Sequence, residues 1–133
     1  MPIAVGDSVT RTRTITDADI RAFADAADDH NPVHMDEDYA AGTPFKARIA
    51  HGLLVASLIA SALASDLPGA GSVYLGQELK FKKPVYIGDT ITATVTVTKY
   101  NERRRIAVIE TVVRNQNGDV VIEGEATVIA PET

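Results

Sequence analysis

The spacing of apolar residues divides the chain into a helical first half and a strand-rich second half. In residues 20–27 the apolar positions recur at three- and four-residue spacing, which predicts an amphipathic helix. Thr16 is a favoured N-cap, and Asp19 three residues later completes a capping box. Asn31-Pro32 then ends the helix, because the residue before a proline avoids the helical region. This interpretation places Asp29 in the last turn of the helix and His34 just past a proline-stiffened turn.

A second, longer helix is predicted over residues 49–66. It is apolar around most of its circumference, so we expect it to be buried on nearly all sides. Serines at positions 57, 61 and 65 form a narrow stripe of small polar residues where another segment could pack closely. Residues 36–41, between the two helices, fit one further short helical turn.

After residue 71 the hydrophobic period changes from helical to two, which is typical of half-buried strands. In residues 73–81 this alternation places Leu75 on the same face as Gln77, and Tyr74 on the other face. An Asn-Gly pair at 117–118 marks a hairpin turn between the last two strands. The predicted strands cover residues 73–81, 90–98, 105–114 and 120–130, with a weaker one at 8–14. The fold class is therefore α+β: an antiparallel sheet wrapped around a long central helix. One sheet covers one side of that helix, so a second copy of the chain is expected against the other side and the sheet edge.

Composition narrows the class of protein. The 133 residues suit one domain, taken as 1–133, and the net charge of −5 argues against nucleic acid as the main partner. The chain has no cysteine, which excludes thiolate catalysis and zinc–sulfur sites. No signal peptide is readable, and the longest uncharged stretch, residues 49–65, is short for a membrane span. We therefore expect a cytoplasmic protein without a membrane partner.

The candidate chemistry lies in Asp29-His30-Asn31-Pro32-Val33-His34 and in His51-Gly52 downstream. An aspartate and a histidine this close can share one water molecule, and a glycine N–H in the first helical turn can hold an oxyanion. Each residue alone has an ordinary structural interpretation; their joint occurrence favours a site. The histidine spacings match no usual zinc pattern, so we expect no metal.

These residues carry a resemblance to a known family. The segments Asp29–His34, Ala50-His51-Gly52-Leu53, Tyr74-Leu75-Gly76-Gln77 and Pro84–Asp89, together with Phe81, resemble the MaoC-like (R)-specific enoyl-CoA hydratases over essentially the whole chain. The resemblance implies a hot-dog fold, a homodimer or a dimer of dimers, and no metal or redox cofactor. It also implies a hydro-lyase that hydrates trans-2-enoyl-CoA to (R)-3-hydroxyacyl-CoA, reversibly, with an acyl-CoA as substrate rather than as cofactor.

Carried over by motif, Asp29 and His34 are the catalytic pair and Gly52 supplies the oxyanion-hole N–H. Asn31 is expected to orient the acid or the water, and His51 to support the site. Which member of the pair is the base stays open. Lys80, Lys82 and Lys83 are either solvated or positioned to meet coenzyme A phosphates.

Two other activities remain as alternatives: a 3-hydroxyacyl-acyl carrier protein dehydratase with the same site, and a hot-dog acyl-CoA thioesterase, in which His34 would be unexplained. A non-catalytic acyl-binding module is a third class. Chain-length preference and pathway, whether polyhydroxyalkanoate supply, β-oxidation or fatty-acid synthesis, stay open.

Overall fold

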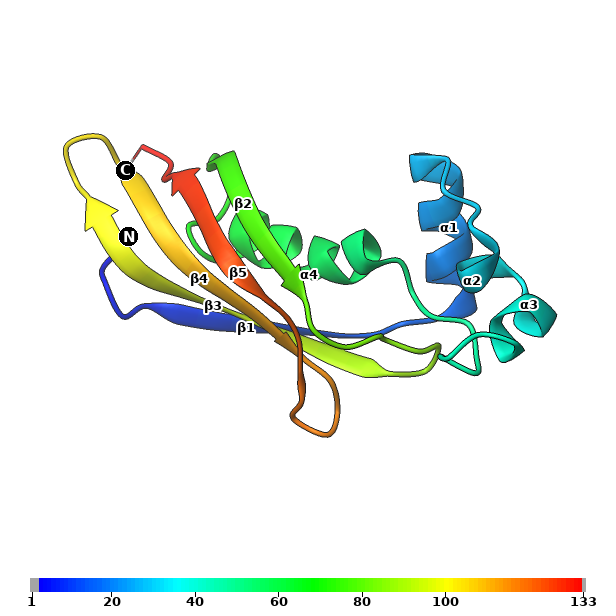
Figure 1. The fold of residues 1–133 in the computed structure, drawn as a ribbon. Coiled ribbons are helices and arrows are strands. Elements are labelled where there is room, and N and C mark those ends of the chain that lie inside the picture. Colours follow the sequence, from blue (N-terminus) through cyan, green and yellow to red (C-terminus); the bar gives the residue numbers. More distant parts are fainter. Residues whose placement is uncertain (1–2, 133) are drawn as a thin grey trace.

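A single curved antiparallel sheet forms one layer of the molecule, and a long helix lies along its concave face (Figure 1). The computed structural model describes residues 3–132. The strand order across the sheet is β1-β3-β4-β5-β2. The elements of this layer are β1 (Ser8–Thr14), β2 (Val73–Phe81), β3 (Thr90–Asn101), β4 (Ile106–Arg114), β5 (Val120–Ile129) and the central helix α4 (Gly52–Ser65). The predicted fold class is confirmed, and each predicted strand is present.

The alternating sequence of β3 separates the two faces of the sheet. Its apolar residues Ile91, Ala93 and Val95 are fully buried against α4, while the intervening threonines lie on the other face. There the hydroxyl of Thr92 lies 3.0 Å from that of Thr12 on β1, one of three such cross-strand hydroxyl pairs between the two strands. The threonine row thus hydrogen-bonds across the convex face of the sheet.

Helix α4 begins three residues later than predicted. Ile49 forms an isolated β-bridge with Tyr86, and the N–H of Ala50 donates to the carbonyl of Val85 at 2.7 Å, so these residues are extended. The prediction of burial on nearly all sides was wrong for the single chain. Leu58 and Ile59 are buried against the sheet, but Leu53 on the opposite side is 60% exposed.

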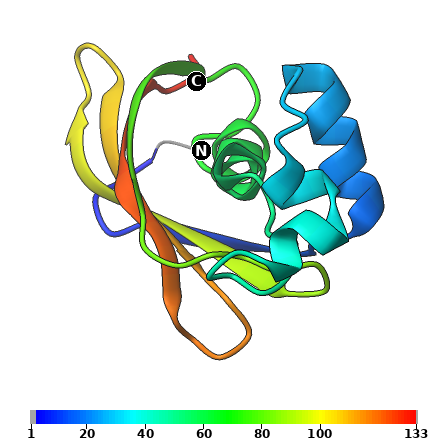
Figure 2. The ribbon, with the colours of Figure 1, turned by 45° about the vertical axis from the view of Figure 1, so that its right-hand side comes forward.

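Three short helices cover the end of the molecule where α4 begins, seen nearly along the α4 axis in Figure 2. They are α1 (Asp17–Ala27), α2 (Pro32–Met35) and α3 (Glu37–Ala41). The predicted capping box between Thr16 and Asp19 at the start of α1 is confirmed. Helix α1 ends at Ala27, because Asp28 adopts a left-handed conformation with φ 54°.

Two boundary predictions near the motif were therefore wrong. Asp29 lies beyond α1 rather than in its last turn, and its N–H donates to the carbonyl of Ala24 at 3.0 Å. His34 lies inside the short helix α2 rather than after a simple proline turn. Proline at the first position of α2 is compatible with a helix start, because that N–H needs no intrahelical partner.

The edge strand β2 contains a bulge that changes its predicted alternation. The register against β5 pairs Tyr74 with Val128 and then Gly76 with Thr127, which leaves Leu75 as the extra residue. Tyr74 therefore shares the inner face with Gln77, and the expected grouping of Leu75 with Gln77 on one face was wrong. None of the described helices is long and apolar enough to cross a membrane.

Candidate active site

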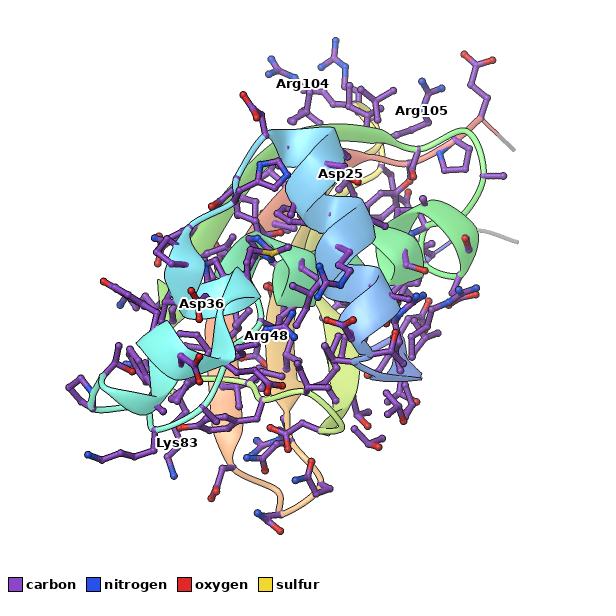
Figure 3. The ribbon with its side chains drawn as sticks, turned by 90° about the vertical axis from the view of Figure 1, so that its right-hand side faces the viewer. Asp25, Asp36, Arg48, Lys83, Arg104 and Arg105 are labelled. Carbon is purple, nitrogen blue, oxygen red and sulfur yellow. The ribbon has the colours of Figure 1, made fainter. Side chains whose placement is uncertain are left out.

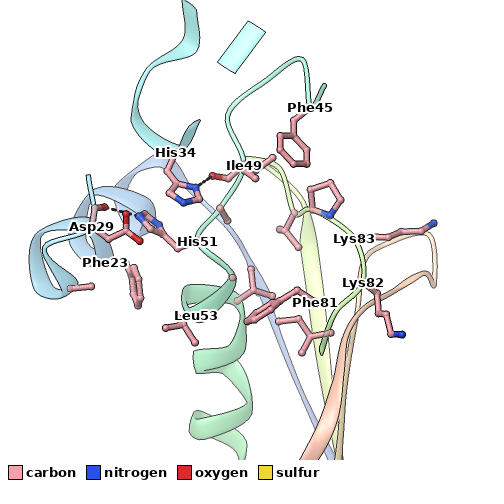
Figure 4. Close-up of a pocket in the computed structure, with 17 residues that line it drawn as sticks. Phe23, Asp29, His34, Phe45, Ile49, His51, Leu53, Phe81, Lys82 and Lys83 are labelled. Carbon is pink, nitrogen blue, oxygen red and sulfur yellow. Dashed lines mark hydrogen bonds between the residues drawn. The ribbon is translucent and has the colours of Figure 1, made fainter. Parts of the chain in front are cut away.

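A pocket of about 650 Å³ opens where the start of α4 meets the short helices and the loop after β2 (Figure 4). One wall carries Asp29, His34 and His51, and Gly52 lies at the start of α4. The other wall comes from the end of β2 at Phe81 and from residues 82–85 that follow it. Residues from four separate parts of the chain thus meet at one cavity, and all three predicted catalytic positions line it.

The carboxylate of Asp29 is held by the backbone of the turn that follows α1. Its Oδ1 accepts a hydrogen bond from the N–H of Asn31 at 3.2 Å. The side chain of Asn31 makes a different contact: its Oδ1 accepts from the N–H of Val33 at 3.3 Å and caps α2. The contact of Asn31 with the acid is therefore made by its backbone, and its side chain fixes the helix that carries His34.

The tautomer of His34 follows from its hydrogen bond. Nδ1 lies 2.7 Å from the carbonyl oxygen of Ile49, and a carbonyl only accepts, so Nδ1 carries the proton. In the neutral ring Nε2 is then left with a free lone pair. Partial burial lowers the pKa of His34 below the ordinary value of 6.5. The hydrogen bond to the Ile49 carbonyl opposes this in part, and the smaller effects of His51, which lowers the pKa, and Asp29, which raises it, come after these two. At neutral pH the side chain is a neutral imidazole with Nε2 as a proton acceptor.

His51 is buried beside this pair, with only 2% of its surface exposed. Its Nε2 donates to the backbone carbonyl of Asp29 at 3.0 Å. The ring lies 4.0 Å from that of His34 and 4.8 Å from that of Phe23, between centroids. Nδ1 of His51 is buried without a hydrogen-bond partner among the described residues. His51 therefore packs between the backbone of Asp29 and the imidazole of His34. His30 instead lies outside the pocket and bonds to Asp25.

Gly52 is the first residue of α4, so its N–H has no intrahelical acceptor. The ring of Phe81 lies directly against its Cα: a Cβ built at this position would come within 2.6 Å of the ring. A side chain at this position would displace the Phe81 ring, and the bare N–H of Gly52 lies at the positive end of the α4 dipole. These are the properties of an oxyanion-binding donor.

Together these groups can activate a water molecule and stabilise an oxyanion beside it. Asp29, His34 and His51 also offer one potential metal-ligating atom each, all within 4.8 Å of one another. The tertiary structure therefore brings together three side chains that could bind a metal ion, although their spacing in the sequence matches no usual metal-binding pattern. The absence of a metal requirement stays a prediction.

Basic side chains lie at the opposite end of the pocket from the aspartate and histidines (Figure 4). Lys82 pairs with Glu123 at 3.2 Å, and Lys83 pairs with Asp119 at 3.3 Å. Both lysines line the pocket while their ammonium groups point away from Asp29 and His34. The proposed contact with coenzyme A phosphates would require exchange of these ion pairs, and it stays a prediction.

One residue that the sequence analysis missed is Arg48. Its guanidinium is buried, and it donates from Nε to the carbonyl of His34 at 2.6 Å and from Nη2 to Asp17 at 2.6 Å. The available signal was a charged residue directly before the uncharged stretch of residues 49–65. A charge at such a position is exposed in most proteins, so the pattern alone did not indicate burial.

Comparison with known proteins points to the same family from a family model and from individual relatives. The family model described as "MaoC like domain" matches residues 4–126. An (R)-specific enoyl-CoA hydratase of Rhodospirillum rubrum is 50% identical over 129 residues, covering 97% of this chain and 89% of that protein. The (R)-specific enoyl-CoA hydratase of Aeromonas caviae is 43% identical over 129 residues, covering 97% of this chain and 96% of its own length.

Solved structures and more distant relatives extend this likeness. The structure of the (R)-hydratase from A. caviae involved in PHA biosynthesis matches with a TM-score of 0.94, covering 97% of this chain and 98% of that one. A mitochondrial 3-hydroxyacyl-[acyl-carrier-protein] dehydratase of Arabidopsis thaliana is 38% identical over 132 residues, covering 97% of this chain and 78% of that protein. The likeness spans both the fold and nearly the whole sequence.

Proposed function

The chain belongs to the MaoC-like domain family, and from this we propose that it is a hydro-lyase that adds water to trans-2-enoyl-CoA, giving (R)-3-hydroxyacyl-CoA, and catalyses the reverse reaction. The observation that carries the proposal is the meeting of Asp29, His34 and Gly52 at one pocket, in a chain 50% and 43% identical to two such hydratases.

In the proposed mechanism one water molecule lies between Asp29 and His34. The carboxylate of Asp29 accepts a hydrogen bond from one O–H group of the water and so orients the water. Nε2 of His34 accepts the proton of the other O–H group. The water oxygen forms a bond to the β-carbon, and the double-bond electrons move to the thioester oxygen as an enolate. The N–H of Gly52 stabilises that oxygen. The imidazolium then returns the proton to the α-carbon, so that H and OH are both added.

This assigns the base, which the sequence left open. The bond from Nδ1 to the carbonyl of Ile49 leaves Nε2 as the free acceptor of a neutral ring. The lowered pKa of His34 keeps that ring ready to accept a proton at neutral pH. Asp29 is then the orienting carboxylate, and Asn31 and His51 hold the pair in place.

An assay of the purified protein tests the proposed function. Loss of the enoyl-thioester absorbance is followed with crotonyl-CoA and longer trans-2-enoyl-CoA substrates, and the chirality of the product is determined. Formation of the (R)-3-hydroxyacyl-CoA supports the proposal. Release of free coenzyme A without hydration would indicate a thioesterase instead, and an (S)-product or no turnover would contradict it.

The acyl carrier is tested in the same assay. The Arabidopsis relative acts on acyl carrier protein substrates by its name, so the matching enoyl-acyl carrier protein is the control substrate. We expect a higher kcat/KM for the coenzyme A thioester. A strong preference for the protein-bound substrate would favour the dehydratase alternative.

We also propose that the active form is a homodimer. The exposed side of α4 and the neighbouring edge strand β2 carry large apolar side chains that a single chain leaves in water: Leu53, Val73, Tyr74, Leu75 and Phe81 are 45–60% exposed. β2 is the last strand of its sheet, so no strand among residues 3–132 pairs with its outer edge. A second copy would cover both features.

A further inference from the structure

Arg48 is a buried charged residue that the proposed mechanism does not use. Only 6% of its side chain is exposed, and such burial is rare for arginine without a specific set of partners. It lies between the short helices at this end of the molecule (Figure 3). Its two bonds join α1 to α2: Nη2 donates to Asp17 in the first turn of α1, and Nε donates to the carbonyl of His34 in α2.

The helix that carries His34 is too short to be stable alone. Helix α2 has four residues, and its last carbonyls have no intrahelical donors. Arg48 supplies a donor and a positive charge to one of these carbonyls, where a cation is favoured by the helix dipole. The N–H of Ile49 donates to the carbonyl of Val33 at 3.2 Å, and the Ile49 carbonyl accepts from Nδ1 of His34. Residues 48–49 therefore hold both the backbone and the ring of His34.

We infer that Arg48 is a positioning residue for His34: its bond to the His34 carbonyl, anchored by Asp17, keeps Nε2 of the imidazole aimed at the reacting water. The inference rests on the proposed function for its kinetic part only. Positioning errors of about 1 Å can cost on the order of 100-fold in rate. Since the bonds of Ile49 remain when Arg48 is replaced, we expect a loss of about tenfold in kcat.

Two substitutions separate the two bonds of Arg48. Glutamine places an amide nitrogen near the position of Nε, so Arg48→Gln keeps a donor for the His34 carbonyl and removes the Asp17 ion pair. Arg48→Met has similar chain volume and removes both bonds. We expect kcat to fall about tenfold in Arg48→Met with KM nearly unchanged, and to stay within about threefold of wild type in Arg48→Gln.

The matched control is Arg21→Met. Arg21 also pairs with Asp17, at 2.8 Å, but it is exposed and forms no hydrogen bond or ion pair with His34. We expect wild-type kcat for this variant. An unchanged kcat in folded Arg48→Met, or an equal loss in Arg21→Met, would overturn the inference. If Arg48→Met does not fold, Arg48→Lys replaces it. The lysine ammonium keeps the positive charge and favours Asp17 over the His34 carbonyl. We therefore expect a severalfold loss in kcat, and an unchanged kcat would contradict the inference.

A measurement without substrate separates this inference from the proposed function. In ¹⁵N NMR spectra the wild-type His34 should show one tautomer, with the proton on Nδ1 and slow exchange. Arg48→Met should show faster exchange or mixed tautomers, and Arg21→Met should match wild type. If the wild type hydrates no enoyl-CoA, the proposed function fails, and these spectra still decide whether Arg48 orders His34. Identical His34 spectra in Arg48→Met and wild type would overturn the inference that Arg48 positions His34.

Discussion

At the scale of single residues, two backbone carbonyls define the chemistry of the site. The carbonyl of Ile49 holds the proton on Nδ1 of His34, and the carbonyl of Asp29 holds a proton on Nε2 of His51. Each imidazole is thereby restricted to one tautomer. This leaves Nε2 of His34 free to accept a proton, and it ties the backbone of Asp29 to His51, whose ring packs on that of His34.

Removal of either member of the proposed pair should abolish most turnover without unfolding the protein. Loss of a general acid or base costs about 10²–10⁴ in rate. We expect Asp29→Asn and His34→Ala each to lower kcat within this range on crotonyl-CoA, with thermal unfolding close to wild type. His30→Asn is the control, because His30 is half-exposed and bonds to Asp25 outside the pocket. Near-normal activity in either site variant would contradict the assignment.

The lowered pKa of His34 predicts where activity and stability depend on pH. A base must be neutral, so the acid limb of the kcat/KM profile should lie below pH 6.5. Because the pKa is lower in the folded than in the unfolded chain, the unfolded state binds the proton first. The stability present above pH 6.5 is therefore lost as the pH falls through the folded pKa. Unfolding at stepped pH in wild type and His34→Gln measures this; an acid limb above pH 6.5 would contradict it.

At the scale of elements, the packing of β2 against β5 depends on one glycine. A Cβ at Gly124 of β5 would lie 1.8 Å from the backbone oxygen of Glu78 on β2, so the strands could not keep their spacing. β2 leads through Phe81 into the wall of the pocket. The shape of the pocket thus depends on how closely these two strands approach.

Gly124→Ala should therefore destabilise the protein strongly. Because the clash is with backbone, the strand itself must move, and we expect a cost on the order of 3 kcal/mol and a fall in Tm of about 10 °C. Gly76→Ala on β2 is the matched control, since a Cβ there meets nothing within 4 Å. Thermal unfolding of both variants measures the difference. Equal Tm values would show that β2 and β5 tolerate a wider spacing.

At the scale of the whole molecule, the exposed apolar residues of α4 and β2 predict a dimer. Leu75 lies in the bulge of β2 and is 52% exposed, away from Asp29 and His34. We expect wild type to elute as a dimer, and Leu75→Arg to shift toward a monomer because a charge at the interface loses its hydration. Val5→Arg is the control: Val5 is 62% exposed but precedes β1, at the opposite sheet edge. Light scattering after size exclusion measures the masses, and a monomeric wild type would contradict the proposal.

Much of this architecture could be predicted from local patterns. Alternation in β3, the Asn-Gly turn before β5 and the capping box of α1 are short-range signals, and each was confirmed. Such signals are readable because side-chain period and cap chemistry depend on residues only a few positions apart. The site of Asp29, His34 and Gly52 was predicted from the joint occurrence of these residue types and from the family resemblance, and the three residues line one pocket.

Other features depend on contacts between distant segments, which no local pattern contains. The start of α4 is delayed because Ile49 and Ala50 pair with the loop that follows β2. Arg48 is buried because Asp17 and the His34 carbonyl, far away in sequence, supply its partners. The tautomer and lowered pKa of His34 likewise come from Ile49, His51 and burial. The sequence alone thus determines which residue types are present for the chemistry. Their protonation states and side-chain orientations arise only from hydrogen bonds and desolvation in the folded protein.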